Sequence, residues 1–342
     1  MNASGRAPRS VEELEEALSR PGAALCAALA PVHGDLLVLG AGGKMGPSLA
    51  RMAKRADPAR RVVAVSRWTR SPAEALLHAH GIETARCDLL DPRALAALPD
   101  APNIVFMAGQ KFGTSSSPAA TWAMNAAVPA FVAERYAGAR IVVFSTGNVY
   151  ALTPPVRGGA RETDPPAPVG EYANSCLARE RLFAAASARH GTLVSIVRLN
   201  YAHDLRYGVL TDLAVRVASR QPIDLSMGFV NVIWQGDANA LALAALVRAM
   251  APEPYVVNVA GPDVLRVADL AGALGTRLGA EPIFTGTEAP DALLSRSAKM
   301  RELLDDPLLP LDTLLDWVAD WVARGGPLLN KPTGFETRDG RF

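Results

Sequence analysis

The chain is poor in cysteine, in long apolar runs and in clustered charge. Its three cysteines lie far apart without metal-ligand spacing, and no uncharged apolar run approaches about 18 residues, so we expect neither a metal site nor a membrane-spanning helix. The formal charge of +1 and the scattered basic residues predict no nucleic-acid or membrane-surface partner. Residues 12–16 are mostly glutamates, where a signal peptide would need apolar residues. Together these absences predict a cytoplasmic protein.

Apolar residues, in contrast, make up 49% of the 342-residue chain, enough for an α/β core and a smaller lobe. From residue 34, short apolar runs alternate with helical stretches. Several runs are rich in Val and Ile without polar alternation, which is typical of strands buried on both faces of a parallel sheet. The sequence therefore predicts an α/β fold with a doubly wound parallel sheet. The predicted strands are 36–40, 61–65, 103–108, 139–145, 193–199 and 255–260.

A glycine-rich loop follows the first predicted strand and opens a helix. Gly40, Gly43 and Gly46 have the spacing Gly-x-x-Gly-x-x-Gly. A pyrophosphate needs bare backbone N–H groups at a helix N-terminus, where any Cβ would obstruct it, so the loop predicts dinucleotide binding. A tight turn without a ligand is the alternative. The expected contacts are Gly40, Gly42, Gly43, Lys44, Met45 and Gly46, although Lys44 could equally be a solvated surface lysine.

The end of the second predicted strand lacks the Asp or Glu with which NAD enzymes hold the ribose hydroxyls. Ser66 and Arg67 stand there instead, and a guanidinium matches the geometry of a 2′-phosphate. This favours NADP, with NAD as the second choice; Arg67 could otherwise be a surface residue stacked over adenine. Asp88, followed by Leu89, is expected at the adenine amino group or as a helix cap.

Further motifs, in the same order and spacing, resemble those of the extended short-chain dehydrogenase/reductase superfamily, in its NAD-dependent epimerase/dehydratase branch. They are Met107-Ala108-Gly109, Asn125, the segment 144–150, Glu171-Tyr172 with Glu180, and Arg198-Leu199-Asn200. The resemblance covers roughly residues 34–325. It implies cofactor contacts at Ala108, Gly109 and Asn125, a sugar or sugar-acid substrate, and a homodimer formed through the helices that carry Asn125 and Tyr172.

With this resemblance the chain divides into four parts. Residues 1–33 are expected to form a helical extension with a capping box of Ser10 and Glu13. Residues 34–200 form the dinucleotide-binding (Rossmann) domain, to which 231–260 return. Residues 201–230 and 261–328 form a smaller α/β substrate lobe, and 329–342 a polar tail.

The resemblance also implies the catalytic groups. Thr146 would bind the reacting oxygen, and Tyr172 would exchange a proton with it while a hydride moves to or from the nicotinamide. The family lowers the tyrosine pKa with a lysine four residues later, but here that residue is Cys176, which brings no positive charge. We expect Cys176 to be a small packed side chain. We hypothesise that Lys111, after the fourth predicted strand, supplies the charge rather than lying on the surface, with Arg179 as a second candidate.

The substrate pocket is expected around Asn200 and around residues 231–237. Arg206 could bind a carboxylate or phosphate, or could lie on a helix surface. Trp234 offers a flat face to a sugar ring but could equally pack in the core. The expected contacts are Asn148, Asn200, Tyr201, Arg206, Asn231, Trp234 and Gln235.

The predicted function is that of an NAD(P)-dependent oxidoreductase or epimerase acting at a secondary alcohol or ketone of a sugar-derived substrate. The missing lysine leaves two alternatives open. One is a catalytically degenerate, cofactor-binding regulator, and the other is a non-redox isomerase or dehydratase.

Overall fold

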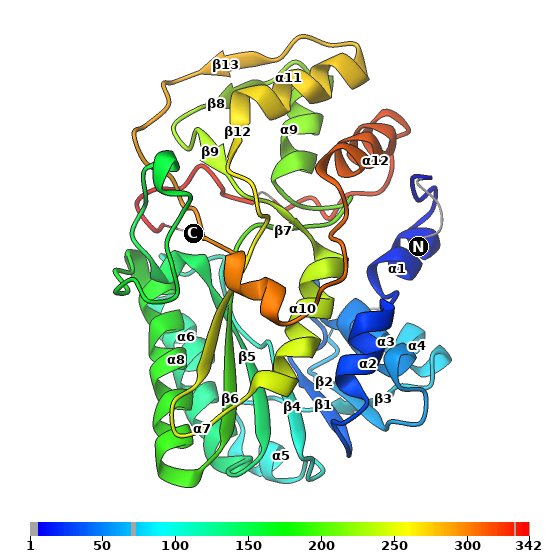
Figure 1. Cartoon of the computed structure of the whole chain (residues 1–342), viewed down its shortest axis with the longest axis vertical. Helices are drawn as coiled ribbons and strands as arrows, with labels where there is room; N and C mark the ends of the chain where they lie inside the picture. Colours follow the sequence, from blue (N-terminus) through cyan, green and yellow to red (C-terminus); the bar gives the residue numbers. More distant parts are fainter. Residues whose placement is uncertain (1–5, 70–72, 332, 342) are drawn as a thin grey trace.

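The protein is described from a computed structural model that covers residues 6–69, 73–331 and 333–341 (Figure 1). Its centre is a seven-stranded parallel sheet with the order β11-β6-β5-β4-β1-β2-β3. The chain order reverses direction between β1 and β4, as in a doubly wound sheet, so the predicted fold class is confirmed. The strands are β1 (Leu36–Leu39), β2 (Val62–Ser66), β3 (Glu83–Arg86), β4 (Asn103–Phe106), β5 (Arg140–Thr146), β6 (Leu193–Leu199) and β11 (Tyr255–Val259).

Six of these strands coincide with the predicted apolar runs. The seventh strand, β3, does not correspond to any of those runs. Its sequence, Glu-Thr-Ala-Arg, has no fully buried residue, because β3 lies at the edge of the sheet and pairs with β2 alone. An edge strand needs no continuous apolar run, so a search for apolar runs could not identify β3.

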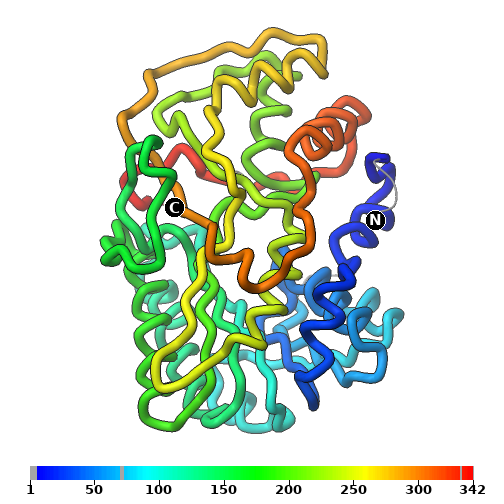
Figure 2. The backbone as a smooth tube through the Cα atoms, in the orientation of Figure 1, coloured from blue at the N-terminus to red at the C-terminus, as the bar shows by residue number. Residues whose placement is uncertain are grey.

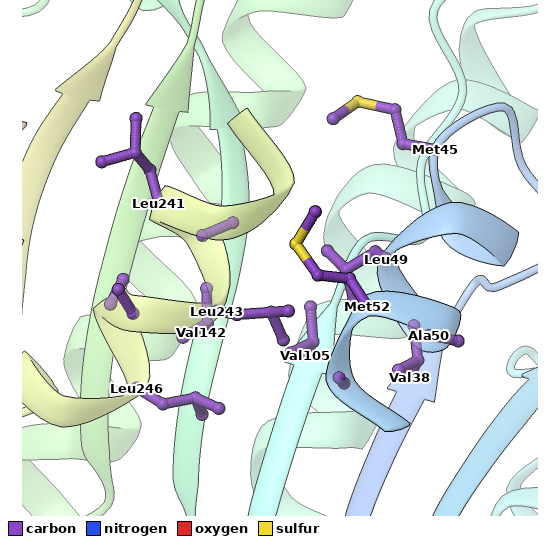
Figure 3. Close-up of a cluster of buried hydrophobic side chains, with 14 of the residues drawn as sticks. Val38, Met45, Leu49, Ala50, Met52, Val105, Val142, Leu241, Leu243 and Leu246 are labelled. Carbon is purple, nitrogen blue, oxygen red and sulfur yellow. The ribbon is translucent and has the colours of Figure 1, made fainter. Parts of the chain in front are cut away.

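Two helical layers cover the sheet. On one face, Val38 packs with Leu49 and Met52 of α3 (Gly46–Ala56) and with Leu243 of α10 (Gln235–Arg248), as Figure 3 shows. On the other face, Leu37 and Leu39 share a core with α7 (Val128–Arg135) and α8 (Gly170–His190). The remaining helices beside the sheet are α2 (Ala23–Leu29), α4 (Ala73–Ala79), α5 (Pro92–Ala96), α6 (Pro118–Trp122) and a π-helical turn (Ala123–Ala127).

A smaller lobe lies beyond the carboxyl ends of the strands and has its own apolar core (Figure 1). It is built from α9 (Val209–Ala218), α11 (Val267–Leu278) and α12 (Leu311–Ala323), with short strand pairs between them. The pairs are β7 (Ala202–His203) with β10 (Ile233–Trp234), β8 (Pro222–Asp224) with β13 (Ile283–Thr285), and β9 (Phe229–Val230) with β12 (Leu265–Arg266).

The described part of the N-terminal extension forms two helices. In α1 (Val11–Leu18), Ser10 accepts a hydrogen bond from the Glu13 backbone N–H at 3.2 Å, but the Glu13 carboxylate accepts from Arg9 N, so only half of the capping box forms. Leu14 and Leu18 are buried in the core of the smaller lobe. On the same helix, Glu16 pairs with Arg55 of α3 at 2.7 Å.

The C-terminal tail crosses the molecule between the sheet and the smaller lobe (red in Figure 2). It begins after α12, where Leu329 N donates to Arg206 O at 3.1 Å, and it ends against the first residue of α8, where Gly340 lies against Gly170. Among the residues that the structure describes, no helix is long and apolar enough to cross a membrane.

Candidate active site

The glycine loop lies at the carboxyl end of β1, next to the loop that follows β4, where a doubly wound sheet binds its ligands. Gly40 has φ +91°, and a Cβ there would lie 2.6 Å from the Ala108 backbone. A Cβ on Gly46 would lie 2.5 Å from Ala41 Cα. Both positions therefore require glycine, and their backbone remains bare at the N-terminus of α3.

A cavity of about 460 Å³ opens beside this loop. Nine of the thirteen predicted cofactor contacts line it: Gly40, Gly42, Gly43, Ser66, Arg67, Asp88, Leu89, Ala108 and Gly109. Arg67 is exposed, and Asp88 also caps the following turn by accepting from Leu90 N at 3.1 Å. The sequence reasoning missed Trp68, whose indole donates to Ala85 O at 3.1 Å and lines the same cavity. Its aromatic side chain directly after Arg67 was the sequence feature that could have identified Trp68 as a cofactor contact.

Other residues that we expected at the cofactor lie elsewhere. Gly46 begins α3, and Asn125 is fully buried behind the cavity. The Asn125 amide accepts from Gln110 N at 2.8 Å and donates to Gln110 O at 2.9 Å, so it fixes the loop after β4. Lys44 and Met45 line a second cavity rather than the first.

This second cavity, of about 240 Å³, contains the predicted catalytic groups. Tyr172, Thr146 and Lys111 all line it, as do the predicted substrate contacts Asn148, Asn200 and Tyr201. The other lining residues are Lys44, Met45, Ser145, Leu199, Ala202, Tyr207, Gly208, Val209, Leu293, Thr333, Gly334, Phe335 and Thr337.

The Tyr172 side chain lines this cavity together with Thr146, and the side chains of Thr146 and Cys176 both act on the pKa of its hydroxyl. Thr146 Oγ1 accepts from Asn148 N at 3.2 Å and from Asn148 Nδ2 at 3.0 Å, which fixes its position. Burial raises the Tyr172 pKa well above its ordinary value, while the charge of Arg179 acts in the opposite direction. Tyr172 is therefore a protonated phenol near neutral pH.

Cys176 is fully buried against Val149, Tyr150 and Ala160, which confirms that it is a packed side chain. Burial raises the pKa of its thiol, so it is neutral near pH 7.

Arg179 lies on the same helix. Its guanidinium donates to Phe144 O at 2.8 Å and to Asn125 Oδ1 at 2.9 Å, and it leaves no room for a Cβ on Gly109. Because a guanidinium is always charged, Arg179 contributes a positive charge that acts on Tyr172.

Lys111 approaches the same cavity from the loop after β4. Its ammonium donates to Thr333 O at 3.3 Å, and burial lowers its pKa to about 8. Its charge lowers the pKa of the Cys176 thiol. The structure thus brings Lys111 into the Tyr172 cavity, and its catalytic role stays a prediction.

Four predicted substrate contacts do not line the Tyr172 cavity, and each of them is held by other groups. Arg206 pairs with Glu15 of α1 at 2.7 Å and with Asp204 at 2.8 Å. Trp234 packs edge-on against Trp317, with ring centroids 5.7 Å apart, as the core alternative anticipated.

The third, Gln235, donates to Ser48 Oγ at 3.2 Å, away from that cavity. Asn231 lies behind the side chains that line the cavity. There it accepts from Asn200 Nδ2 at 3.1 Å and donates to Ser295 O at 2.6 Å. Asn231 is thus in position to fix the Asn200 side chain, which itself lines the cavity.

A buried ionic network supports the end of β5. Glu180 of α8 accepts from Ser145 Oγ at 2.5 Å and forms two hydrogen bonds, of 3.0 and 2.7 Å, with Arg198. Arg198 also donates to the Tyr150 hydroxyl at 2.6 Å. These contacts lock the strand end that carries Thr146 to the helix that carries Tyr172. Within the described residues, no cluster of His, Cys, Asp and Glu could hold a metal ion.

Comparison with solved structures shows which known proteins share this fold. Solved structures with similar folds include UDP-glucose 4-epimerase from Thermotoga maritima with UDP-glucose, at 17% identity and a TM-score of 0.71, covering 85% of this chain and 99% of that one. MoeE5 in complex with UDP-glucuronic acid and NAD has 19% identity and a TM-score of 0.69, with the same coverage of both chains. A UDP-glucuronic acid 4-epimerase variant from Bacillus cereus has 16% identity and a TM-score of 0.68, again with 85% and 99% covered.

A search of curated proteins found no match to this sequence. The model of the NAD dependent epimerase/dehydratase family, however, matches residues 36–210, which include the glycine loop, Thr146 and Tyr172. The chain therefore belongs to the NAD-dependent epimerase/dehydratase family.

Proposed function

We propose that the protein is an NAD(P)-dependent oxidoreductase or epimerase that acts at a secondary alcohol or ketone of a sugar-derived substrate. The observation that carries this proposal is that the Tyr172 and Thr146 side chains line one cavity next to the glycine loop. A protein that only sensed the cofactor would need neither hydroxyl. The sugar nucleotides bound by the similar solved structures support a sugar-derived substrate.

The bare glycine loop and the neighbouring cavity fit a dinucleotide. Gly40, Gly42 and Gly43 line this cavity without Cβ atoms, and α3 begins directly behind them. When bound, the nicotinamide would accept or donate a hydride. Ser66 and Arg67, with no carboxylate at the end of β2, support NADP, while the NAD in MoeE5 supports the second choice.

The chain's own residues would move the proton. In the direction of reduction, Tyr172 Oη donates its proton to the substrate oxygen as a carbonyl becomes a hydroxyl, and the phenolate that remains is stabilised by the Thr146 hydroxyl and by Arg179. In the direction of oxidation the same oxygen takes the proton back. We propose Lys111 as a further positive charge on the cavity wall.

Replacement of Tyr172 by Phe tests this function. We expect turnover to fall by about 100- to 10,000-fold, because the proton donor is lost. Dinucleotide binding, measured by fluorescence titration, should be unchanged. Turnover equal to the wild type would contradict the proposed role of Tyr172. Binding of a dinucleotide without turnover of any sugar by the wild type would favour the regulator, and turnover without nicotinamide oxidation or reduction at any stage would favour the non-redox isomerase.

We further propose that the protein is a cytoplasmic homodimer that assembles through α6, α7 and α8. Trp122 and Phe131 are large apolar side chains exposed on this side, and Trp122 also donates to Glu171 at 2.6 Å. All three cysteines are free thiols, which agrees with a reducing compartment. Light scattering of the wild type and of Phe131→Glu tests the dimer, because a charge in the interface should yield monomers.

A further inference from the structure

Two lysines from different loops face the cavity that contains Tyr172. The Lys44 ammonium donates to Ala202 O at 3.3 Å and lies 4.2 Å from the centre of the Tyr207 ring. Lys111 donates to Thr333 O at 3.3 Å. All five residues line the same cavity of about 240 Å³. The cavity therefore concentrates positive charge in a small space that is partly shielded from water.

Such an arrangement favours an anion. Burial lowers the pKa of Lys44 to about 8; Asp204 opposes this shift, and the charge of Lys111 adds to it. The pKa of Lys111 is also about 8. Most molecules thus carry both charges at pH 7, and the two ammonium groups repel each other. A carboxylate or phosphate between them would remove this repulsion and form charge-assisted hydrogen bonds.

The tail sets the size of the cavity. Thr333, Gly334, Phe335 and Thr337 form part of its wall. Pockets for drug-sized ligands have volumes of about 300–1,000 Å³, and this cavity, at about 240 Å³, lies below that range. A monosaccharide fits this space, whereas the nucleoside diphosphate of a nucleotide sugar would have to extend beyond it.

The tail is held in place by specific contacts. Thr333 donates to Asp212 of α9 through its backbone N–H at 3.1 Å and through its hydroxyl at 2.6 Å. Phe335 is buried in the core of the smaller lobe. Arg338 forms an ion pair with Asp291. These contacts fix the tail against the smaller lobe, so it is a stable part of the cavity wall.

We propose that this cavity binds a monosaccharide-sized substrate that carries a carboxylate or phosphate, with Lys44 and Lys111 as its anion ligands and residues 333–337 as the wall that excludes nucleotide sugars. The proposal rests on the function proposed above and specifies its substrate class. The hydroxyls of Thr146 and Tyr172 would then face the reacting alcohol or ketone of the same molecule. In this respect the chain would differ from the similar solved structures, which bind UDP-sugars.

Calorimetric binding to the full chain tests the anion ligands, with D-glucuronate, D-glucose 6-phosphate and uncharged D-glucose as probes. Lys44→Met should weaken binding of the preferred charged probe by about 10- to 100-fold, the value of a charged hydrogen bond, and should leave glucose binding unchanged. The preferred probe distinguishes a carboxylate from a phosphate. Lys299→Met is the matched control, because Lys299 also donates to a backbone carbonyl, at 2.7 Å, and lies 4.2 Å from a tyrosine ring, but outside the cavity.

The role of the tail is tested with UDP-glucuronate. It should bind measurably better to a chain that ends at Leu329, and to the milder variant Arg338→Ala, than to the wild type. The inference is overturned if Lys44→Met binds the charged probes like the wild type, if it weakens the dinucleotide instead, or if the wild type binds UDP-glucuronate as tightly as both tail variants. These are binding measurements, so anion binding through Lys44 can hold even if Tyr172→Phe shows that the proposed chemistry is wrong.

Discussion

Arg179 provides the sharpest test of how this site works without the family's lysine. It lies seven residues after Tyr172 on α8, and its charge opposes the rise in the tyrosine pKa that burial causes. We predict that Arg179→Met slows turnover by removing the charge that stabilises the phenolate. A nearby opposite charge lowers the pKa of an acid by roughly 1–3 units, and each unit corresponds to about 1.4 kcal/mol. The expected loss in kcat/KM is therefore about 100-fold.

The assay is the pH dependence of kcat/KM for nicotinamide oxidation or reduction. For Arg179→Met, the limb that reports ionisation of Tyr172 should move to higher pH, because the phenol becomes a weaker acid. Arg179→Lys keeps the charge and should retain most of the activity. The double variant Cys176→Lys with Arg179→Met restores a cation one helical turn after Tyr172 and should recover both rate and pH profile.

Arg179 is buried and donates to Phe144 O and Asn125, so loss of folding must be separated from loss of charge. Thermal unfolding of each variant makes that distinction, since the double variant lacks the same hydrogen bonds as Arg179→Met. If Arg179→Met folds and keeps the wild-type pH profile, the charge at Tyr172 comes from elsewhere. Lys111→Met would then be the variant expected to show the shift.

Three further predictions concern the cofactor and stability. Arg67→Ala should raise the KM for NADP about tenfold, and Ser66→Asp should shift preference toward NAD, as initial rates with both cofactors would show. Asp237 is half-buried and accepts from Leu309 N at 2.8 Å, and removal of its carboxyl from water raises its pKa from 3.8 to about 7. The folded chain therefore holds an extra proton between these pH values and loses stability as the pH rises through them. Asp237→Asn avoids this loss and should be more stable at pH 8 by at most about 4 kcal/mol in urea titrations, whereas a variant no more stable than the wild type would contradict the raised pKa. Glu180→Gln leaves Arg198 without its buried partner and should lower the free energy of unfolding by about 3–5 kcal/mol.

The sequence was sufficient to predict the sheet and the side chains at its strand ends. Thr146 ends β5, and Tyr172 lies in the first turn of α8, so the parallel topology alone brings both toward one edge. Gly40, Ser66 and Ala108 meet for the same reason. Local patterns report such positions because they depend on which strand a residue follows.

Pairings between distant segments could not be predicted in this way. Arg206 follows β7 in a polar segment typical of a substrate loop, yet its partner is Glu15, 191 residues away in the N-terminal extension. Lys44 belongs to the glycine loop but extends toward Ala202, and Thr333 reaches the cavity from a tail that looked merely polar. Each outcome depends on the direction of a long side chain or on the path of a segment without periodicity, and neither leaves a local signal.

The N-terminal helix α1 has a consequence for how the cleft can move. Leu14 and Leu18 are buried in the smaller lobe, Glu15 holds Arg206, and Glu16 holds Arg55 beside the sheet. Swinging the two lobes apart would break these ion pairs or pull apolar side chains into water, at a cost of several kcal/mol. The N-terminal extension therefore holds the two lobes together. With the lobes held in this way, the space around Tyr172 is set by the C-terminal tail, which forms part of the cavity wall.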